Sequence, residues 1–126
     1  MAKAERSFDA GAPLDFSEAL ARLRGDHDLL LDLIRFFLAD WPTLRDSLRE
    51  ALAAQDRSVV ERVGHSIKGL AANLDASQVV ELAKSVEVTA LKDPWDVLSA
   101  RIDTLEQAGA MIVGRLEAYL ATHSAN

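Results

Sequence analysis

The chain has 126 residues, 49% of them hydrophobic and 27% charged, and a formal net charge of −6 at pH 7. These values are typical of one soluble globular domain that can bury a core of its own. The negative charge argues against nucleic acid as a partner, because a nucleic-acid-binding protein presents a basic face. There is no cysteine, which excludes disulfides and thiol chemistry.

No stretch approaches the roughly 18 apolar residues of a membrane span, so we expect no contact with a membrane. Residues 1–7 are followed by no apolar run, so we expect no signal peptide and a cytoplasmic location. Residues 1–13 contain Gly11 and Pro13 without periodicity and are interpreted as a flexible N-terminal tail. The domain is expected over residues 14–122, followed by a C-terminal tail over 123–126.

The first half of the domain predicts a short helix and then a long apolar one. Asp15, with Glu18 three residues later, resembles a capping box for a short helix that ends at Gly25. Asp26 can cap the next helix, which we expect to run to about residue 40. Its apolar residues cover more than one face, so the excess must pack under the short helix or meet a partner. Packing is the favoured explanation for this excess, which lies around Leu31, Ile34 and Leu38.

Pro42 predicts a break or kink near residues 40–41, because proline is tolerated near a first helical turn but not in a helix interior. A third helical segment would then run to about residue 52. Asp56 and Ser77 can cap the next two helices, and Asp93 with Pro94 predicts the start of a last helix over about 95–121.

No segment alternates apolar and polar residues in the manner of a half-buried strand, and the loops are short. The predicted fold is therefore all-α. We expect an antiparallel four-helix bundle with a short additional N-terminal helix.

Residues 62–73 carry the most informative pattern. The apolar side chains of this helix form one stripe at core-facing spacing, which places His65 on the opposite, solvent side. Gly64 and Gly69 each cost the helix roughly 1 kcal/mol relative to alanine, a cost that makes sense if something must approach the backbone. We therefore expect a partner to dock around the histidine, on a surface formed by Ser58, Glu61, Gly64, Gly69 and Ala72, with Leu38 as a further candidate.

The motif His65-x-x-Lys68-Gly69, with Ala72-Asn73-Leu74 and residues 82–87 after it, resembles the histidine-containing phosphotransfer (HPt) domain. Residues 14–16, 19–23 and 36–42 are similar to the first helices of that family, so the resemblance covers about residues 14–120. Three positions depart from the family pattern. Ile67 replaces a leucine, Val86 replaces the leucine before Glu87, and Asp75 stands at a usual turn glycine, where aspartate can adopt the left-handed conformation.

The hairpin after this helix predicts which groups lie near the histidine. In an antiparallel pair that turns near residue 76, residues whose numbers sum to about 152 lie level. His65 then lies level with Glu87, and Lys68 with Lys84. The resemblance implies that Glu87 accepts a hydrogen bond from the imidazole and leaves its other nitrogen free. Lys68, one turn along on the same face, could meet a phosphoryl group, and Lys84 is a second candidate.

We therefore expect a monomeric phosphorelay intermediate. The resemblance implies that His65 exchanges a phosphoryl group with an aspartate of a response-regulator receiver domain, or accepts one from a sensor or hybrid histidine kinase. Such a chain is a phosphoryl carrier, not an enzyme with turnover, and it needs no cofactor, because the receiver holds the Mg²⁺. Neither a glycine-rich phosphate loop nor a metal-ligand motif is evident. His27 and His123 lack the flanking support of His65 and are interpreted as surface residues.

Two alternatives stay open. The chain could be a helical adaptor that keeps the HPt fold without being phosphorylated, or a detached HPt module of a hybrid sensor kinase. The initial Met1 favours an independent protein over a detached module. Acid-labile, base-stable phosphate on the protein would distinguish a carrier from an adaptor.

Overall fold

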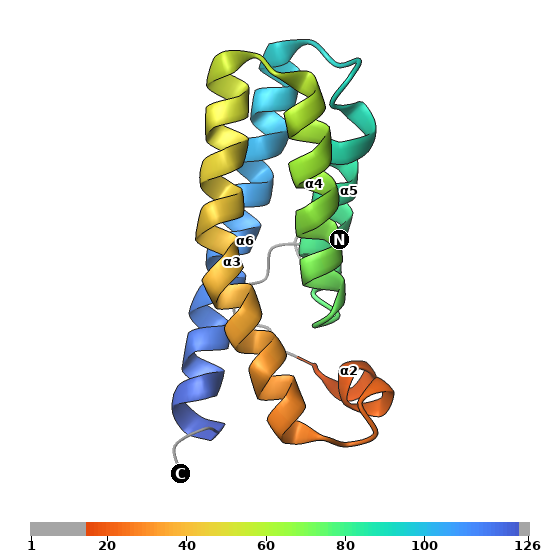
Figure 1. Ribbon diagram of the computed structural model, residues 1–126, viewed down its shortest axis with the longest axis vertical. Coiled ribbons are helices and arrows are strands. Elements are labelled where there is room, and N and C mark those ends of the chain that lie inside the picture. Colours follow the sequence, from red (N-terminus) through yellow and green to blue (C-terminus); the bar gives the residue numbers. More distant parts are fainter. Residues whose placement is uncertain (1–14, 124–126) are drawn as a thin grey trace, which may run out of the picture.

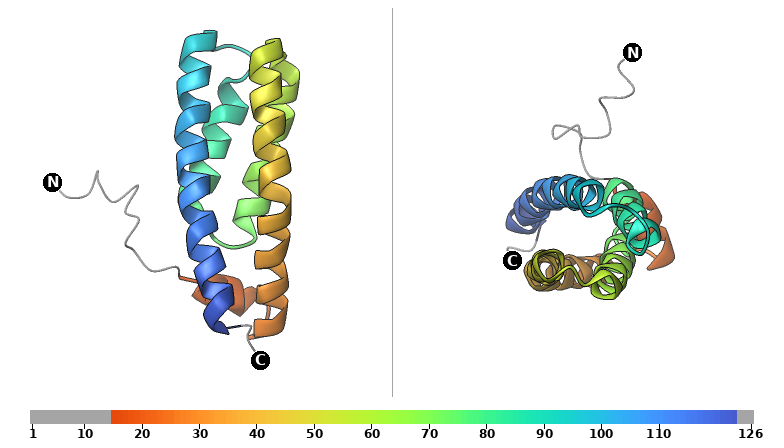
Figure 2. Two further views of the ribbon diagram at one scale, coloured as in Figure 1. Left: turned by 90° about the vertical axis from the view of Figure 1, so that its left-hand side faces the viewer. Right: turned by 90° about the horizontal axis from the view of Figure 1, so that it is seen from above.

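The computed structural model describes residues 15–123, and within that range every regular element is an α-helix. The elements are α2 (Ser17–Arg22), α3 (His27–Ala54), α4 (Arg57–Ala72), α5 (Ser77–Thr89) and α6 (Trp95–His123). Each of the four longer helices packs against the next, and α6 returns to α3 and closes the bundle (Figure 2). The predicted four-helix bundle with a short additional helix is confirmed.

The helices differ in length, and this difference decides where α2 lies. The outer pair, α3 and α6, have 28 and 29 residues, whereas α4 and α5 have 16 and 13. At 1.5 Å per residue α3 is about 42 Å long and α4 only about 24 Å. Figure 1 shows α2 below the turn that joins α4 to α5, in the space that the shorter helices leave.

Arg22, in the last turn of α2, fastens this helix to the α4–α5 turn. Its guanidinium lies 3.0 Å from Asp75 Oδ1 and also donates to the carbonyls of Ala72 and Asn73 at 3.4 Å. Asp75 has φ 53°, so it adopts the left-handed conformation expected of it. A cation thereby meets the carboxyl end of α4, where unpaired carbonyls favour positive charge.

The predicted break at Pro42 is wrong, because α3 runs through Pro42 as one helix. Proline removes a single hydrogen bond here, the one to the carbonyl of Leu38. Trp41, next to it, is only 2% exposed and stacks on Phe37 with ring centroids 6.0 Å apart. A Cβ at Gly109 of α6 would collide with the Trp41 ring, so the two helices are in close contact there. Figure 1 shows α3 bending along its length without being interrupted.

The apolar excess of α3 is used in packing. Leu31 and Ile34 are buried, and Leu38 is half-buried against the same core. The favoured explanation is therefore confirmed. A residue on α2, Ala19, is also fully buried in this core, which is how the short helix becomes part of the domain.

The predicted capping box of Asp15 and Glu18 does not form, because Phe16 is the N-cap residue of α2 and that helix has no side-chain cap hydrogen bond. Of the caps predicted at Asp26, Asp56 and Ser77, the first two hold. Asp26 and Asp56 accept hydrogen bonds from the backbone amides of Leu29 at 3.0 Å and Val59 at 3.3 Å. Ser77 is not a cap, because the left-handed Asp75 turns the chain early and Ser77 becomes the first residue of α5.

The domain ends differ slightly from expectation. The short first helix ends at Arg22, before the predicted Gly25, and His123 belongs to α6, although it was assigned to the C-terminal tail. The predicted tail over residues 1–13 and the rest of the tail over 124–126 lie outside the described residues.

Candidate functional site

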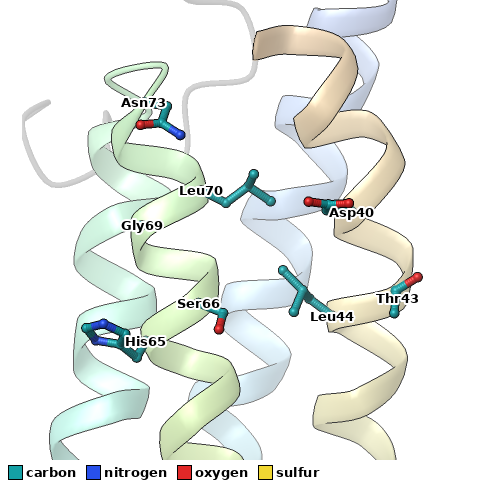
Figure 3. A pocket seen from close by; sticks show the side chains of 8 residues that line it. All are labelled: Asp40, Thr43, Leu44, His65, Ser66, Gly69, Leu70 and Asn73. Carbon is teal, nitrogen blue, oxygen red and sulfur yellow. The ribbon is translucent and has the colours of Figure 1, made fainter. Parts of the chain in front are cut away.

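His65 lies in the middle of α4 and is accessible from solvent. Its side chain is 67% exposed, whereas Val63 and Ile67 on either side of it are buried. This alternation confirms that the helix turns its apolar stripe inward and His65 outward. Figure 3 shows the imidazole directed away from Ser66 and Leu70, which lie on the other flank of the same helix.

Glu87 of α5 holds the imidazole in one orientation. Its Oε2 lies 2.8 Å from His65 Nδ1. An ionised carboxylate can only accept a hydrogen bond, so Nδ1 must carry the proton. In the neutral ring the lone pair is then on Nε2, the nitrogen that Glu87 does not engage. The level pairing predicted across the α4–α5 hairpin thus brings the two side chains into contact.

The same carboxylate also faces a cation. Lys68 Nζ lies 2.8 Å from Glu87 Oε1, so the two oxygens of Glu87 serve two different partners. The contact is an ion pair without the alignment of a hydrogen bond, since Oε1 has no hydrogen-bond partner. Lys68 is the main cause of a lowered pKa of Glu87, with a smaller contribution from His65, and partial burial of the carboxylate opposes both.

Lys84, the second predicted cation, is not paired with Glu87. Its side chain is exposed, and no ion pair among residues 15–123 includes it. The level pairing placed Lys84 opposite Lys68, but two like charges do not attract, and Lys68 turns toward Glu87 instead. The site therefore contains one cation at ion-pair distance from the carboxylate.

Gly64 does not lie on the docking surface where the sequence analysis placed it. It is buried against α5, where an added Cβ would stand 3.2 Å from the amide nitrogen of Glu87 and 3.4 Å from the carbonyl oxygen of Ala83. The absence of a side chain at Gly64 lets the two backbones approach. The reason for this glycine is helix packing, and its effect is to bring Glu87 within reach of His65.

Gly69 and Ala72 do lie on the exposed side. Nothing comes within 4 Å of a Cβ built on Gly69, and Ala72 is exposed one turn further on. Ser58 is exposed, but its hydroxyl bonds to the cap residue Asp56. Glu61 is half-buried, and Leu38 is half-buried against the core. The part of all five residues in docking a partner stays a prediction.

A groove between α3 and α4 is the feature that the sequence analysis missed. It has a volume of about 610 Å³ and begins beside His65 (Figure 3). Its lining residues are Asp40, Thr43, Leu44, His65, Ser66, Gly69, Leu70 and Asn73. The level-pairing argument, applied to the α3–α4 turn at residues 55–56, could have found it, because residues whose numbers sum to about 110 lie level there.

The other two histidines are distant from His65 in the sequence and lie at helix ends. His27 begins α3 and bonds through Nε2 to the Tyr119 hydroxyl at 2.8 Å, while His123 ends α6 and stacks on the same tyrosine. His27 is half-buried, so its assignment as a surface residue holds only in part. No cluster of three or more metal-ligating side chains occurs among the described residues. None of the described helices is both long enough and apolar enough to cross a bilayer.

The comparisons with known proteins give one match. No curated protein and no solved structure is matched, whereas the family profile described as the Hpt domain matches residues 32–121. The matched range covers most of the chain and contains His65, Lys68 and Glu87. Members of this family take part in phosphotransfer in two-component signalling, as carriers of the phosphoryl group. The chain belongs to the Hpt domain family.

Proposed function

We propose that His65 is the phosphoacceptor of a phosphorelay, and that it exchanges the phosphoryl group with an aspartate of a receiver domain. The observation that carries this proposal is the hydrogen bond from Nδ1 to Glu87, which leaves Nε2 with its lone pair on an exposed imidazole. Histidine is a suitable nucleophile because it is largely neutral near pH 7.

The chemical step is a transfer between two side chains. The Nε2 lone pair of His65 forms a bond to phosphorus, and the bond from phosphorus to the aspartyl oxygen breaks, with its electron pair returning to the carboxylate. Throughout, the Nδ1 proton stays hydrogen-bonded to Glu87. The carboxylate thereby stabilises the positive charge that develops on the ring during the attack.

Lys68 also contributes to this step. In the unphosphorylated chain its ammonium is paired with Glu87. A phosphoryl group on Nε2 adds negative oxygens to the same face, one turn away, and a lysine side chain is long enough to move toward them. Lys68 therefore favours the phosphorylated state.

The proposal also covers the partners. A sensor or hybrid histidine kinase and a receiver supply and remove the phosphoryl group, and Mg²⁺ belongs to the receiver. The chain acts in the cytoplasm as a monomeric carrier without turnover of its own. Gly69 and Ala72 leave room beside His65 for the receiver's active site.

The experiment that tests the proposal uses receiver domains from the same genome, each labelled on aspartate from a small-molecule phosphodonor. Each is mixed with the wild-type chain and with His65→Gln. We expect the label to move to the wild-type chain with at least one receiver, to be acid-labile and base-stable, and to be absent from His65→Gln. Failure of every receiver and every histidine kinase to exchange label with the wild-type chain would instead favour the adaptor alternative.

A further inference from the structure

The end of α5 that carries Glu87 is held by groups outside the helix. Glu87 lies two residues before Thr89, the last residue of α5, and so belongs to the final turn of that helix. The last four carbonyls of a helix have no partner within it, and a helix end frays unless other groups bond to it. The position of the Glu87 carboxylate beside His65 therefore depends on what fixes this turn.

Arg57, the first residue of α4, bonds to the backbone just beyond that turn. Its Nη1 donates to the carbonyl oxygens of Ala90 at 2.9 Å and Asp93 at 2.7 Å. A cation at the carboxyl end of a helix is also stabilised by the helix dipole. Because Arg57 is on the helix of His65 and Ala90 is the C-cap residue of the helix of Glu87, these bonds tie the two helices together.

The α4–α5 hairpin is thus closed at both ends. At one end the chain turns through Asp75, to which Arg22 of α2 is bonded, and at the other end Arg57 binds the α5–α6 turn. Figure 1 shows the start of α4 and the α5–α6 turn at the same end of the bundle, opposite to the α4–α5 turn. His65 and Glu87 lie between these two ties, so a shift of α5 along α4 requires one of the ties to break.

The groups around Arg57 are themselves held in place. The guanidinium carbon of Arg57 lies 4.3 Å from the centroid of the Trp95 ring, a cation–π contact, and Trp95 is half-buried against the core. Arg101 of α6 bonds to the Asp93 carboxylate at 2.9 Å and to the Ser85 hydroxyl at 2.9 Å. Arg101 therefore ties α5 to α6, whereas Arg57 ties α5 to the helix of the histidine.

We propose that Arg57 is a positioning residue for the phosphoryl acceptor and acts through Glu87. It fixes the last turn of α5 at the level where the Glu87 carboxylate meets Nδ1 of His65. This inference rests on the proposed function, because it identifies a residue that helps to keep Nε2 free for phosphorus. His65 lies about 12 Å further along α4, so Arg57 contacts neither the imidazole nor the phosphoryl group.

The test compares Arg57→Gln with Arg49→Gln, which removes the same charge. Arg49 pairs with Asp103 and Glu106 and so joins α3 to α6, neither of which carries the histidine or its carboxylate partner. The ¹⁵N chemical shifts of His65, recorded without any phosphodonor, report the ring tautomer. We expect Arg57→Gln to populate the tautomer with the proton on Nε2 and Arg49→Gln to keep the wild-type shifts, although both substitutions lower the thermal midpoint. Wild-type shifts in Arg57→Gln would overturn the inference.

Labelling of His65 by phosphoramidate, which needs no docking, measures the effect on the reaction. Arg57→Gln should be labelled about three-fold more slowly than the wild-type chain, a smaller loss than that of Glu87→Ala, because the carboxylate is displaced and not removed. In a Glu87→Ala background the same substitution should change the rate by less than about two-fold. Equal slowing in both backgrounds would overturn the inference, since it would show that Arg57 does not act through Glu87.

A second variant covers the case in which Arg57→Gln does not fold. Arg57→Met keeps an apolar side chain against the Trp95 ring but has no N–H donor, so the same two measurements apply to it with the same expected results. A wild-type chain that no phosphodonor labels would contradict the proposed function, and the tautomer comparison would still decide whether Arg57 holds Glu87 in place.

Discussion

Gly64 of α4 lies directly against the backbone of Glu87 of α5, so closely that a Cβ at Gly64 would be 3.2 Å from the Glu87 amide nitrogen. One residue further along α4, His65 reaches the side chain of the same glutamate. The close approach of the two helices and the orientation of the imidazole therefore depend on one position without a side chain.

The two glycines near His65 should respond differently to alanine. Gly69→Ala meets open space and gains helix propensity, so it should raise the free energy of unfolding by up to about 1 kcal/mol. Gly64→Ala gains the same propensity but must push α5 away by a few tenths of an ångström, so its stability should lie below that of Gly69→Ala. Urea denaturation of both variants measures the difference, and an equal gain at both positions would contradict close packing at Gly64.

Gly69→Gln should act on docking. The bulkier side chain would project beside His65 into the space that the receiver must enter. We expect slower transfer from a receiver with a nearly unchanged thermal midpoint, and Gly114→Gln, another helix glycine with open space around it, is the matched control. Wild-type transfer rates in Gly69→Gln would show that this face is not covered.

Glu87→Ala should release the imidazole. Without its carboxylate partner, the Nδ1 proton is no longer held, and both neutral tautomers become populated. Phosphorylation should slow on the order of ten-fold, which corresponds to the roughly 1.4 kcal/mol expected of a hydrogen bond to a charged group. The ¹⁵N chemical shifts of His65 report the tautomer directly, and shifts identical to those of the wild-type chain would mean that Glu87 does not orient the ring.

Lys68→Ala should raise the pKa of Glu87 toward its ordinary value, because Lys68 is the main cause of its lowered pKa. A carboxyl group with a lowered pKa in the folded state stabilises the fold above its unfolded-state pKa, about 4.3 for glutamate. That contribution is lost as the pH falls through the lowered value. The wild-type chain should therefore lose this stability at a lower pH than Lys68→Ala, and an NMR titration of the Glu87 carboxyl carbon in both chains tests it.

At neutral pH the same substitution should affect the phosphorylated state more than the fold. An exposed ion pair contributes only about 0.2–1 kcal/mol to stability. The phosphohistidine of Lys68→Ala should hydrolyse faster, since its oxygens lose their nearest cation. A half-life equal to that of the wild-type chain would show that Lys68 stays with Glu87 after phosphorylation.

The sequence predicted the bundle well from its periodicity, and the register of a short hairpin placed Glu87 level with His65. The hydrogen bond between them was implied by the family resemblance and is present in the structure. The sequence predicted the role of Gly64 poorly, since a helix glycine on the surface and one between two helices give the same pattern. The break predicted at Pro42 was wrong because the burial of Trp41 stabilises α3 there. That burial depends on tertiary packing, which the local sequence does not show. The groove was missed because Leu44 and Leu70 pack on the core and line a surface at the same time.

The central claim is that Nε2 of His65 carries the phosphoryl group because Glu87 holds Nδ1. The measurement that tests it most directly is the ³¹P–¹⁵N correlation in the phosphorylated chain with ¹⁵N-labelled histidine, recorded beside His65→Gln. The account predicts a single phosphorus bonded to Nε2 of His65, and no signal in the variant. A phosphorus bonded to Nδ1 of His65, or to His27 or His123, would contradict it.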